Sequence, residues 1–179
     1  MNAHGPGIPP REASRIELRH LCETDEALYC SLYTDPETMA FVSPPLSAEL
    51  AIRNFHEVLH PEDSGHGVFI VLEKATGAAI GLCGWHSSNA RKRQLEIGIL
   101  LNARGRSRRY SKEAITAVVD RAFAALPIDT VWVQYQRANS AADRLFVGLG
   151  MQLHGIEAGK RAQPTRVVRS ICRSMWRCI

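Results

Sequence analysis

Three apolar, strand-like segments follow one another through the middle of the chain, and this run constrains the fold more than any other feature. They cover residues 67–73, 78–86 and 94–101. A short connector ending in Gly77 joins the first two segments, which favours a β-hairpin. The run therefore predicts the antiparallel part of a larger sheet.

Helical and further strand patterns flank this run on both sides. Thr24 and Ser47 are expected as N-caps of two helices that prolines end. Helices are predicted over residues 24–34, 47–59, 110–126 and 140–149, the last closed by Gly150. Further strands are predicted over residues 15–21, 130–136 and 166–176. The order predicts one α/β domain with a mixed sheet over residues 14–179, after a disordered lead-in over residues 1–13.

Charge is distributed unevenly along the chain, although its net value of +4 is unremarkable. Residues 1–90 hold 5 Lys/Arg and 12 Asp/Glu, a net −7, whereas residues 91–179 hold 17 and 6, a net +11. Such an asymmetry suggests that two ligands of different charge meet on one domain. The longest apolar runs are too short to span a membrane, so no membrane association is expected.

Cysteine usage and the N-terminal segment indicate the cellular setting. The five cysteines are an odd number without a C-x-x-C motif, which argues against a disulfide framework and a structural zinc site. The Gly/Pro-rich start of the chain has no apolar core of a signal peptide. We therefore expect free thiols and a cytoplasmic protein.

A basic segment lies between the third central strand and the next helix. Orphan N–H groups and the dipole at the start of that helix would form an anion site. Five basic residues would strengthen it: Arg104, Arg106, Arg108, Arg109 and Lys112. The segment suits a phosphate-bearing ligand, although a solvated basic surface or a nucleic-acid patch would have the same charge.

Residues 96–114, E-I-G-I-L-L-N-A-R-G-R-S-R-R-Y-S-K-E-A, resemble a signature of the GNAT superfamily of acyl-CoA-dependent N-acyltransferases. The nearest pattern is that of its RimJ/RimL-like branch, E-I-G-Y-W-L followed by R-G-x-G-Y-A-x-E-A. A second family pattern, N-x-x-S-x-x-x-L-x-x-x-G-F, aligns with residues 139–151. The segments I-E-L-R, T-D-P-E-T-M and I-G-L-C-G-W-H also resemble this branch, so that the similarity covers about residues 15–157.

This resemblance implies a GNAT fold, an α+β domain with a mainly antiparallel sheet of about seven strands flanked by helices. It also implies transfer of an acetyl group from acetyl-CoA to a primary amine by direct attack on the thioester, without a metal. A protein N-terminus, a small amine and aminoacyl-tRNA all remain open as acceptors, so tRNA or the ribosome could be a partner. The protein is expected as a monomer or homodimer.

The resemblance also implies roles for individual residues. Glu96 is the expected base, acting on the amine through water, and His86 is the second candidate. Backbone groups near Leu100 would polarise the thioester carbonyl, and the helix start would hold the pyrophosphate. The implied coenzyme-binding residues are Ile99, Leu100, Leu101, Arg106, Ser107, Arg108, Arg109, Tyr110, Ser111, Asn139, Ala142 and Phe146.

The sequence departs from the family pattern at four of these positions. Arg109 and Ser107 stand where the family has loop glycines, and a Cβ there can block close approach or disfavour a positive φ. Either Arg109 turns toward the phosphates or coenzyme binding is weakened. Ala142 replaces a serine near the thiol, and Phe146 replaces a tyrosine acid. The proton for the departing thiolate would then come from water or from Tyr135.

Residues 56–60, H-E-V-L-H, match the zinc-hydrolase motif H-E-x-x-H. His56 and His60 would be ligands, Glu57 the base and His66 a third ligand. Pro61 ends the helix directly after the second histidine, which weakens this alternative.

Charge leaves two further expectations open. In one, the domain lacks catalysis and binds RNA or another acidic partner through basic residues at 161, 166, 169, 173 and 177. In the other, the acidic first half supplies the two early helices that, as the resemblance implies, wall the acceptor site, and acidic walls would suit a cationic amine.

Overall fold

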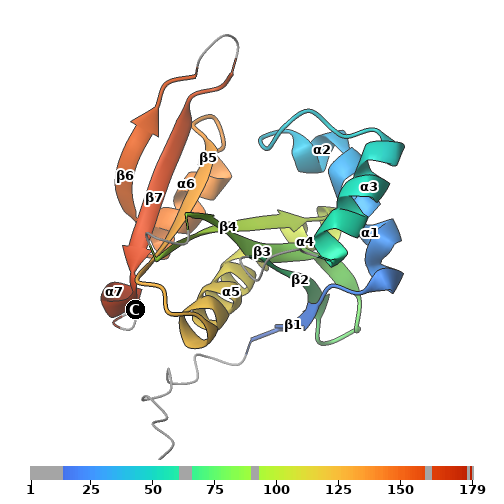
Figure 1. The fold of residues 1–179 in the computed structure, drawn as a ribbon, viewed down its shortest axis with the longest axis horizontal. Helices are drawn as coiled ribbons and strands as arrows, with labels where there is room; N and C mark the ends of the chain where they lie inside the picture. Colours follow the sequence, from blue (N-terminus) through green and yellow to red (C-terminus); the bar gives the residue numbers. More distant parts are fainter. Residues whose placement is uncertain (1–13, 61–65, 90–92, 160–162, 177, 179) are drawn as a thin grey trace, which may run out of the picture.

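The computed structural model describes residues 14–60, 66–89, 93–159, 163–176 and 178; the expected lead-in, residues 1–13, lies outside them. One mixed sheet runs through the molecule (Figure 1). Its strands are β1 (Ile16–His20), β2 (His66–Glu73), β3 (Ala79–Asn89), β4 (Gln94–Leu101), β5 (Thr130–Gln136), β6 (Gln152–Glu157) and β7 (Arg166–Cys172). The helices are η1 (Glu23–Asp25), α1 (Glu26–Thr34), α2 (Pro36–Met39), α3 (Ala48–Leu59), α4 (Ala103–Ser107), α5 (Ser111–Ala125), α6 (Ser140–Gly148) and α7 (Arg173–Trp176).

The sheet has the order β1-β2-β3-β4-β5-β7-β6, and its neighbouring strands are antiparallel except for β4 and β5. The parallel register of β4 and β5 comprises three residue pairs and stops at Glu96 and Trp132. Past this point the two strands diverge (Figure 1). The strand β4 continues beside β3, and β5 continues beside β7. The sheet is therefore open in its middle.

Helices cover the two faces of the sheet with two hydrophobic clusters. On one face α5 packs over the centre, with Ile115, Val118 and Val119 fully buried against strand residues such as Leu95 and Ile97. On the other face α1 and α3 cover β2, β3 and β4 through a smaller cluster. This cluster comprises Tyr29, Leu32, Met39, Phe55, Ile70, Leu82 and Leu100. Glu96 lies between Leu95 and Ile97, so its side chain is on the face of α1 and α3.

The strands and long helices whose ranges were predicted occur in the expected order, including the hairpin at the central run, and β6 is a further strand for which no range was predicted. Ser47 caps α3 by accepting a hydrogen bond from the Leu50 N–H at 3.2 Å, and Gly150 follows α6 with a φ of 70°. The prediction that Thr24 begins a helix is wrong in detail, because residues 23–25 form the short helix η1 before α1.

The predicted final strand over residues 166–176 is too long. The strand β7 ends at Cys172, and α7 follows because tertiary hydrogen bonds draw the chain away from the sheet. The Arg173 guanidinium donates to the carbonyl oxygens of Leu126 at 2.8 Å and Ile128 at 2.7 Å. The buried Trp176 donates its indole N–H to Asp120 at 2.6 Å.

The basic segment contains a helix that the sequence pattern did not indicate. The helix α4 occupies residues expected to be loop, and the Asn102 side chain caps it by accepting from the Gly105 N–H at 3.0 Å. Its predominantly polar sequence has no helical apolar stripe, so the periodicity argument missed it. Among the described residues no helix has the length and apolar character needed to cross a membrane.

Two glycines on adjacent strands provide a test of the packing. Gly84 of β3 and Gly98 of β4 lie opposite each other in the register. A Cβ at Gly84 would overlap the carbonyl oxygen of Gly67, whereas one at Gly98 would meet nothing within 4 Å. We expect Gly84→Ala to lower the free energy of unfolding in urea by about 1–3 kcal/mol and Gly98→Ala to change it by less than about 0.5 kcal/mol. Equal losses in the two variants would contradict this packing.

Candidate active site

A pocket of about 490 Å³ occupies the opening between β4 and β5. Its inner wall is formed by residues 97–100 of β4, residues 134–136 of β5, and three apolar side chains of α6, Ala142, Leu145 and Phe146. Its other wall comes from the first half of the chain through Tyr33, Phe41, Val42 and Val58. These side chains are apolar or aromatic, and no acidic residue of this half lines the pocket among the described residues; Glu62 and Asp63 lie outside them.

The two predicted catalytic residues meet inside this pocket. Glu96 and His86 are directly opposite in the antiparallel register of β3 and β4, which brings both side chains to the same face. The His86 Nε2 is 3.2 Å from the Glu96 Oε2, and the carboxylate is only 15% exposed. The Gln134 side-chain amide of β5 donates to the other carboxylate oxygen at 3.0 Å.

Sequence reasoning did not identify Gln134, although a polar residue between Val133 and Tyr135 in a β-rich segment was a signal. The buried residues Val131, Val133 and Tyr135 alternate with it along β5, so Gln134 must point to the opposite face, where Glu96 lies. His66 was considered only as a zinc ligand. Its ring stacks against that of His86, with the ring centres 6.2 Å apart.

The predicted thioester-binding positions lie on the part of β4 that follows the end of its pairing with β5. Ile99 and Leu100 line the pocket, whereas Leu101 is buried beside it and its carbonyl oxygen accepts a hydrogen bond from Arg106 at 2.7 Å. Because the parallel register ends at Glu96, the edge of β4 over residues 97–101 has no β5 residue paired with it. Alternate backbone N–H groups of this edge therefore point into the opening.

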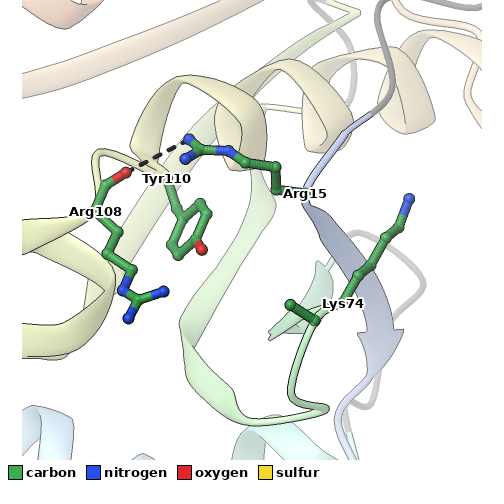
Figure 2. Close-up of a pocket in the computed structure, with 5 residues that line it drawn as sticks. Arg15, Lys74, Arg108 and Tyr110 are labelled. Carbon is green, nitrogen blue, oxygen red and sulfur yellow. Dashed lines mark hydrogen bonds between the residues drawn. The ribbon is translucent and has the colours of Figure 1, made fainter.

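A second hollow, of about 510 Å³, lies beside the basic segment and shares no lining residue with the first pocket (Figure 2). It is lined by Arg15, Lys74, Ala75, Arg108 and Tyr110. Its two arginines are paired with acids: Arg15 with Glu113, and Arg108 with Glu73 at 3.1 Å. The positive charge around this hollow is therefore largely compensated by the protein itself.

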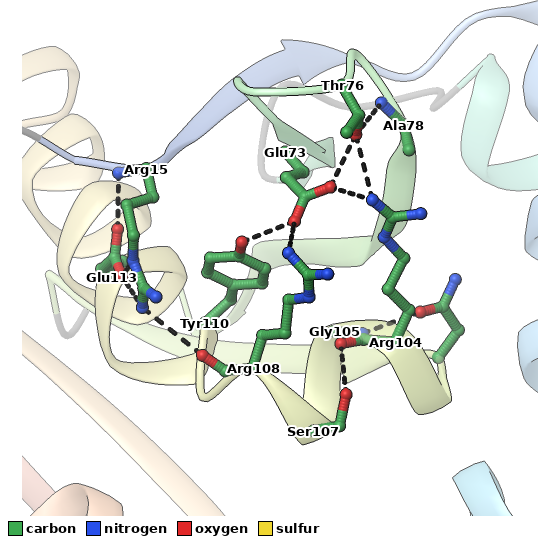
Figure 3. A network of polar contacts seen from close by, with 11 residues as sticks. Arg15, Glu73, Thr76, Ala78, Arg104, Gly105, Ser107, Arg108, Tyr110 and Glu113 are labelled. Atoms are coloured by element: carbon green, nitrogen blue, oxygen red, sulfur yellow. Dashed lines mark hydrogen bonds and ion pairs between the residues drawn. The ribbon is translucent and has the colours of Figure 1, made fainter.

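Glu73, fully buried at the end of β2, ties the basic segment to the hairpin (Figure 3). Its carboxylate accepts hydrogen bonds from the hydroxyl groups of Thr76 and Tyr110, both at 2.6 Å, and pairs with Arg104 and Arg108. The two hydroxyl groups and the guanidinium of Arg104 lower the pKa of Glu73 to about 2. The carboxylate thus stays ionised throughout the physiological range and holds α4 and the start of α5 in place.

Arg106 and Ser107 are also engaged with protein groups. Besides the Leu101 carbonyl, the Arg106 guanidinium donates to the Thr38 hydroxyl at 2.8 Å, and so links α4 to α2. The Ser107 hydroxyl donates to the Arg104 carbonyl at 3.0 Å. Three of the four arginines of this segment therefore stabilise the turn through their polar ends, although their side chains stay 37–57% exposed.

Arg109 is the exception, and its backbone explains why the family pattern has glycine there. Its φ is 60°, in the left-handed region that costs a non-glycine residue about 1–2 kcal/mol. Its side chain is exposed and has no ion pair with any residue in the described part of the chain. Directly after it, α5 begins at Ser111, and the N-cap Tyr110 supplies no side-chain hydrogen bond to the first turn.

The start of α6 is formed as its sequence motif indicates. The Asn139 side chain caps the helix by accepting from the Ala142 N–H at 3.0 Å. Phe146, one turn further along, is buried at the pocket wall and stacks on the Tyr135 ring with the ring centres 5.5 Å apart. These side chains give the α6 side of the pocket an apolar surface without a hydroxyl group at position 142 or 146.

Tyr135 lines the pocket, but its hydroxyl group is committed elsewhere. It donates to the Asp143 carboxylate at 2.6 Å and accepts from Arg169 at 2.8 Å. Burial and the bond to Asp143 raise the pKa of Tyr135. The hydroxyl is therefore a weak candidate for the acid that protonates a departing thiolate.

The chain matches the family described as "Acetyltransferase (GNAT) domain" over residues 15–152. This range includes the hairpin, the opening between β4 and β5, the basic segment and α6. The chain belongs to the GNAT acetyltransferase family. It is thus an N-acetyltransferase with acetyl-CoA as co-substrate, and the alternative of a binding module without catalysis is set aside.

Relatives and solved structures agree with this GNAT assignment. The chain is 26% identical over 152 residues to the uncharacterized N-acetyltransferase YoaA of Bacillus subtilis (strain 168), covering 83% of this chain and 86% of that protein. It is 21% identical to the uncharacterized N-acetyltransferase p20 of Bacillus licheniformis, over 79% of this chain and 82% of that one. Its fold is similar to that of spermidine N-acetyltransferase from Vibrio cholerae in complex with CoA and spermine, with a TM-score of 0.80, 18% identity and coverage of 90% and 98%.

The zinc-hydrolase alternative fails on geometry. His60 lies outside α3 with a non-helical φ of −123°, His56 is 3.5 Å from Glu26, and no three potential ligands cluster within the described chain. Of the five basic residues considered for RNA binding, Arg161 and Arg177 lie outside the described residues, and two others are bound to groups of the GNAT domain itself. Arg169 pairs with Asp143 at 2.9 Å, and Arg173 donates to backbone carbonyl groups.

The Glu73 network gives a stability prediction for this GNAT domain. Because its folded-state pKa is about 2 against an ordinary value of 4.5, ionised Glu73 stabilises the fold above pH 4.5, and this contribution disappears as the pH falls toward 2. We expect Glu73→Gln to lower the Tm by several degrees at pH 7. The difference from the natural protein should shrink as the pH falls from 4.5 toward 2.

The matched control is Glu57→Gln, which removes an exposed carboxylate 3.8 Å from Arg53 on α3. Exposed pairs contribute little, so its Tm should change by less than about 2 °C. Thermal melts followed by circular dichroism measure both variants. A Glu73→Gln difference that is independent of pH would show that the charge of Glu73 has no part in the network.

Proposed function

We propose that the protein acetylates a primary amine at the Glu96 end of the opening between β4 and β5, in a direct transfer from acetyl-CoA. The observation that carries the proposal is the pair of Glu96 and His86, 3.2 Å apart, inside the pocket that the strand divergence creates. A fold neighbour, the spermidine N-acetyltransferase of Vibrio cholerae, was solved with spermine, which supports an amine acceptor. The RimJ/RimL-like branch is proposed on the sequence motifs alone.

Glu96 takes the proton that the attacking amine must lose. A protonated amine has no lone pair for attack, so a base must act before or during bond formation. The Gln134 amide fixes one carboxylate oxygen, and the other faces His86, which is 47% exposed. The proton can therefore pass from the amine to Glu96 through water, and from there to His86 and solvent.

Two backbone features hold the coenzyme in this proposal. Alternate N–H groups along residues 97–101 of β4 bind the pantetheine arm and the thioester carbonyl, in the place where the parallel ladder with β5 has stopped. The uncapped start of the fifteen-residue helix α5 binds the pyrophosphate through its orphan N–H groups. The exposed side chain of Arg109 adds positive charge beside this helix start. Bound acetyl-CoA supplies an activated acetyl group.

Replacing the proposed base tests the assignment. We expect Glu96→Gln to lower kcat by about 100-fold or more at pH 7, with the Kd for acetyl-CoA unchanged. Its residual rate should rise about tenfold per pH unit, because only the amine deprotonated by solvent reacts. Thiol release measures the rates and calorimetry measures the Kd. The exposed Glu17→Gln variant on β1 serves as the control, and an equal effect of both substitutions would remove Glu96 as the base.

Two substitutions at Arg109 separate its charge from its Cβ. Arg109→Ala removes the charge and keeps the Cβ at a positive φ, so we expect acetyl-CoA to bind about threefold to tenfold more weakly. Arg109→Gly removes both, and its free energy of unfolding should be about 1 kcal/mol higher than that of Arg109→Ala. Calorimetric titration and urea unfolding measure these effects. Tighter binding by Arg109→Gly than by the natural chain would show instead that the Cβ obstructs the coenzyme.

A further inference from the structure

The acceptor end of the pocket has little negative charge. Within its described lining Glu96 is the single carboxylate, and it is already engaged with Gln134 and His86. The other charged side chain of that described lining is Arg166, accompanied by the imidazole rings of His66 and His86. The described lining therefore offers no net negative charge to a ligand with several positive charges.

The wall that faces these polar groups is apolar. Tyr33 and Val58 project from α1 and α3, and Phe41 and Val42 come from the connection after α2. Phe41 and Val42 are adjacent in the chain and remain 43% and 42% exposed at the pocket rim. They offer an apolar surface that an apolar portion of the acceptor could cover.

Arg166 lies at the far end of the same pocket. It begins β7 opposite Gln136 of β5, and its neighbour Val167 is buried in the cluster beneath α5 and α6. Strand alternation therefore directs the Arg166 side chain to the opposite face, the one that also carries Glu96 and Gln134. It is half-buried and has no ion pair with a described residue, in contrast to Arg169 three residues later. Glu157 of β6 lies opposite Arg166 in the register on the other side, exposed and without an ion pair to it. The half-buried guanidinium therefore keeps donors that are suited to bind a carboxylate in the pocket.

The strand registers give the spacing between the two ends. Glu96 lies opposite Trp132, and Arg166 opposite Gln136, so the two residues are two strands apart and offset by four residues along β5. With strands about 4.8 Å apart and a rise of about 3.3 Å per residue, their Cα atoms are separated by about 16 Å. An extended dipeptide or tripeptide, about 7–11 Å long, leaves about 5–9 Å of this gap for the two side chains to cover, whereas a single amino acid leaves about 12 Å.

We propose that the acceptor is a primary amine on a peptide-like carrier, apolar next to the amine and bearing a carboxylate two or three residue lengths away that Arg166 binds. This inference rests on the proposed function, because it places the amine at Glu96. Arg166 binds and orients the acceptor and takes no part in proton transfer. The recognition of the carboxylate excludes polyamines as the preferred acceptors.

Matched peptides test the proposal with the full chain and acetyl-CoA. The probes are alanyl-phenylalanine, its C-terminal amide, and spermidine, each assayed by thiol release. We expect kcat/KM for the free acid to exceed that for the amide by about tenfold, the ratio for one charged hydrogen bond, and spermidine to be poorer than both. A third peptide, amidated alanyl-phenylalanyl-aspartate, offers a side-chain carboxylate instead. Preference for it over alanyl-phenylalanine indicates a protein N-terminus as the source, and the reverse indicates a free short peptide.

Variants connect the preference to Arg166. Arg166→Gln should abolish the acid-to-amide ratio, Arg166→Lys should retain part of it, and Arg166→Glu should reverse it. Arg144→Gln on the exposed face of α6 is the control and should leave the ratio at its natural value. Because the ratio compares two substrates of one variant, a general loss of stability does not alter it.

The outcomes separate this inference from the proposed function. An acid-to-amide ratio near one in the natural protein, or spermidine as the best acceptor, overturns the role of Arg166 and leaves the Glu96 mechanism standing. Absence of thiol release with every amine, in a protein that binds acetyl-CoA, overturns both. Calorimetric titration of the CoA complex with the acid and the amide gives a second readout. Equal affinities there would also refute carboxylate recognition.

Discussion

The short parallel ladder between β4 and β5 is the contact on which the rest of the structure depends. Its three residue pairs bring Glu96 and Gln134 within hydrogen-bonding distance, and its end leaves the facing edge of β4 without a strand partner. Backbone N–H groups in such an opening need hydrogen-bond partners. A ligand with amide and carbonyl groups can provide them. The same divergence produces the pocket that contains Glu96, His86 and Arg166.

The charge of the basic segment is mostly used to build the turn that precedes α5. Glu73 pairs with Arg104 and Arg108, and Arg106 bonds across to α2. Ionised partners held by several hydrogen bonds restrict the segment to one arrangement. Among these four arginines, Arg109 is the one whose side chain has no ion pair or hydrogen bond to a described residue, and its backbone is left-handed. The segment therefore combines a firmly held backbone turn with exposed basic side chains beside the helix start, Arg109 and Lys112.

Much of the fold follows from local patterns. Alternation identified the strands, and helical periodicity and capping residues such as Ser47 and Asn139 identified the long helices. The short helix α4 was missed because it lacks an apolar stripe, and α7 because Arg173 and Trp176 bind groups about fifty residues earlier in the chain. At the site, Glu96 was found from its motif, whereas Gln134 depends on pairing between strands that are far apart in sequence.

The sequence by itself determined the order of elements, the family signature and the candidate base, because each depends on residues that are close along the chain. Only the tertiary structure decided which charges face a ligand. The arginines near residue 106 turned out to be bound to Glu73, Leu101 and Thr38, while Arg166 stayed without an ion pair among the described residues. The physical reason is that an ionic group's role depends on the partners within a few ångströms. Here those partners come from strands and helices that are distant in sequence.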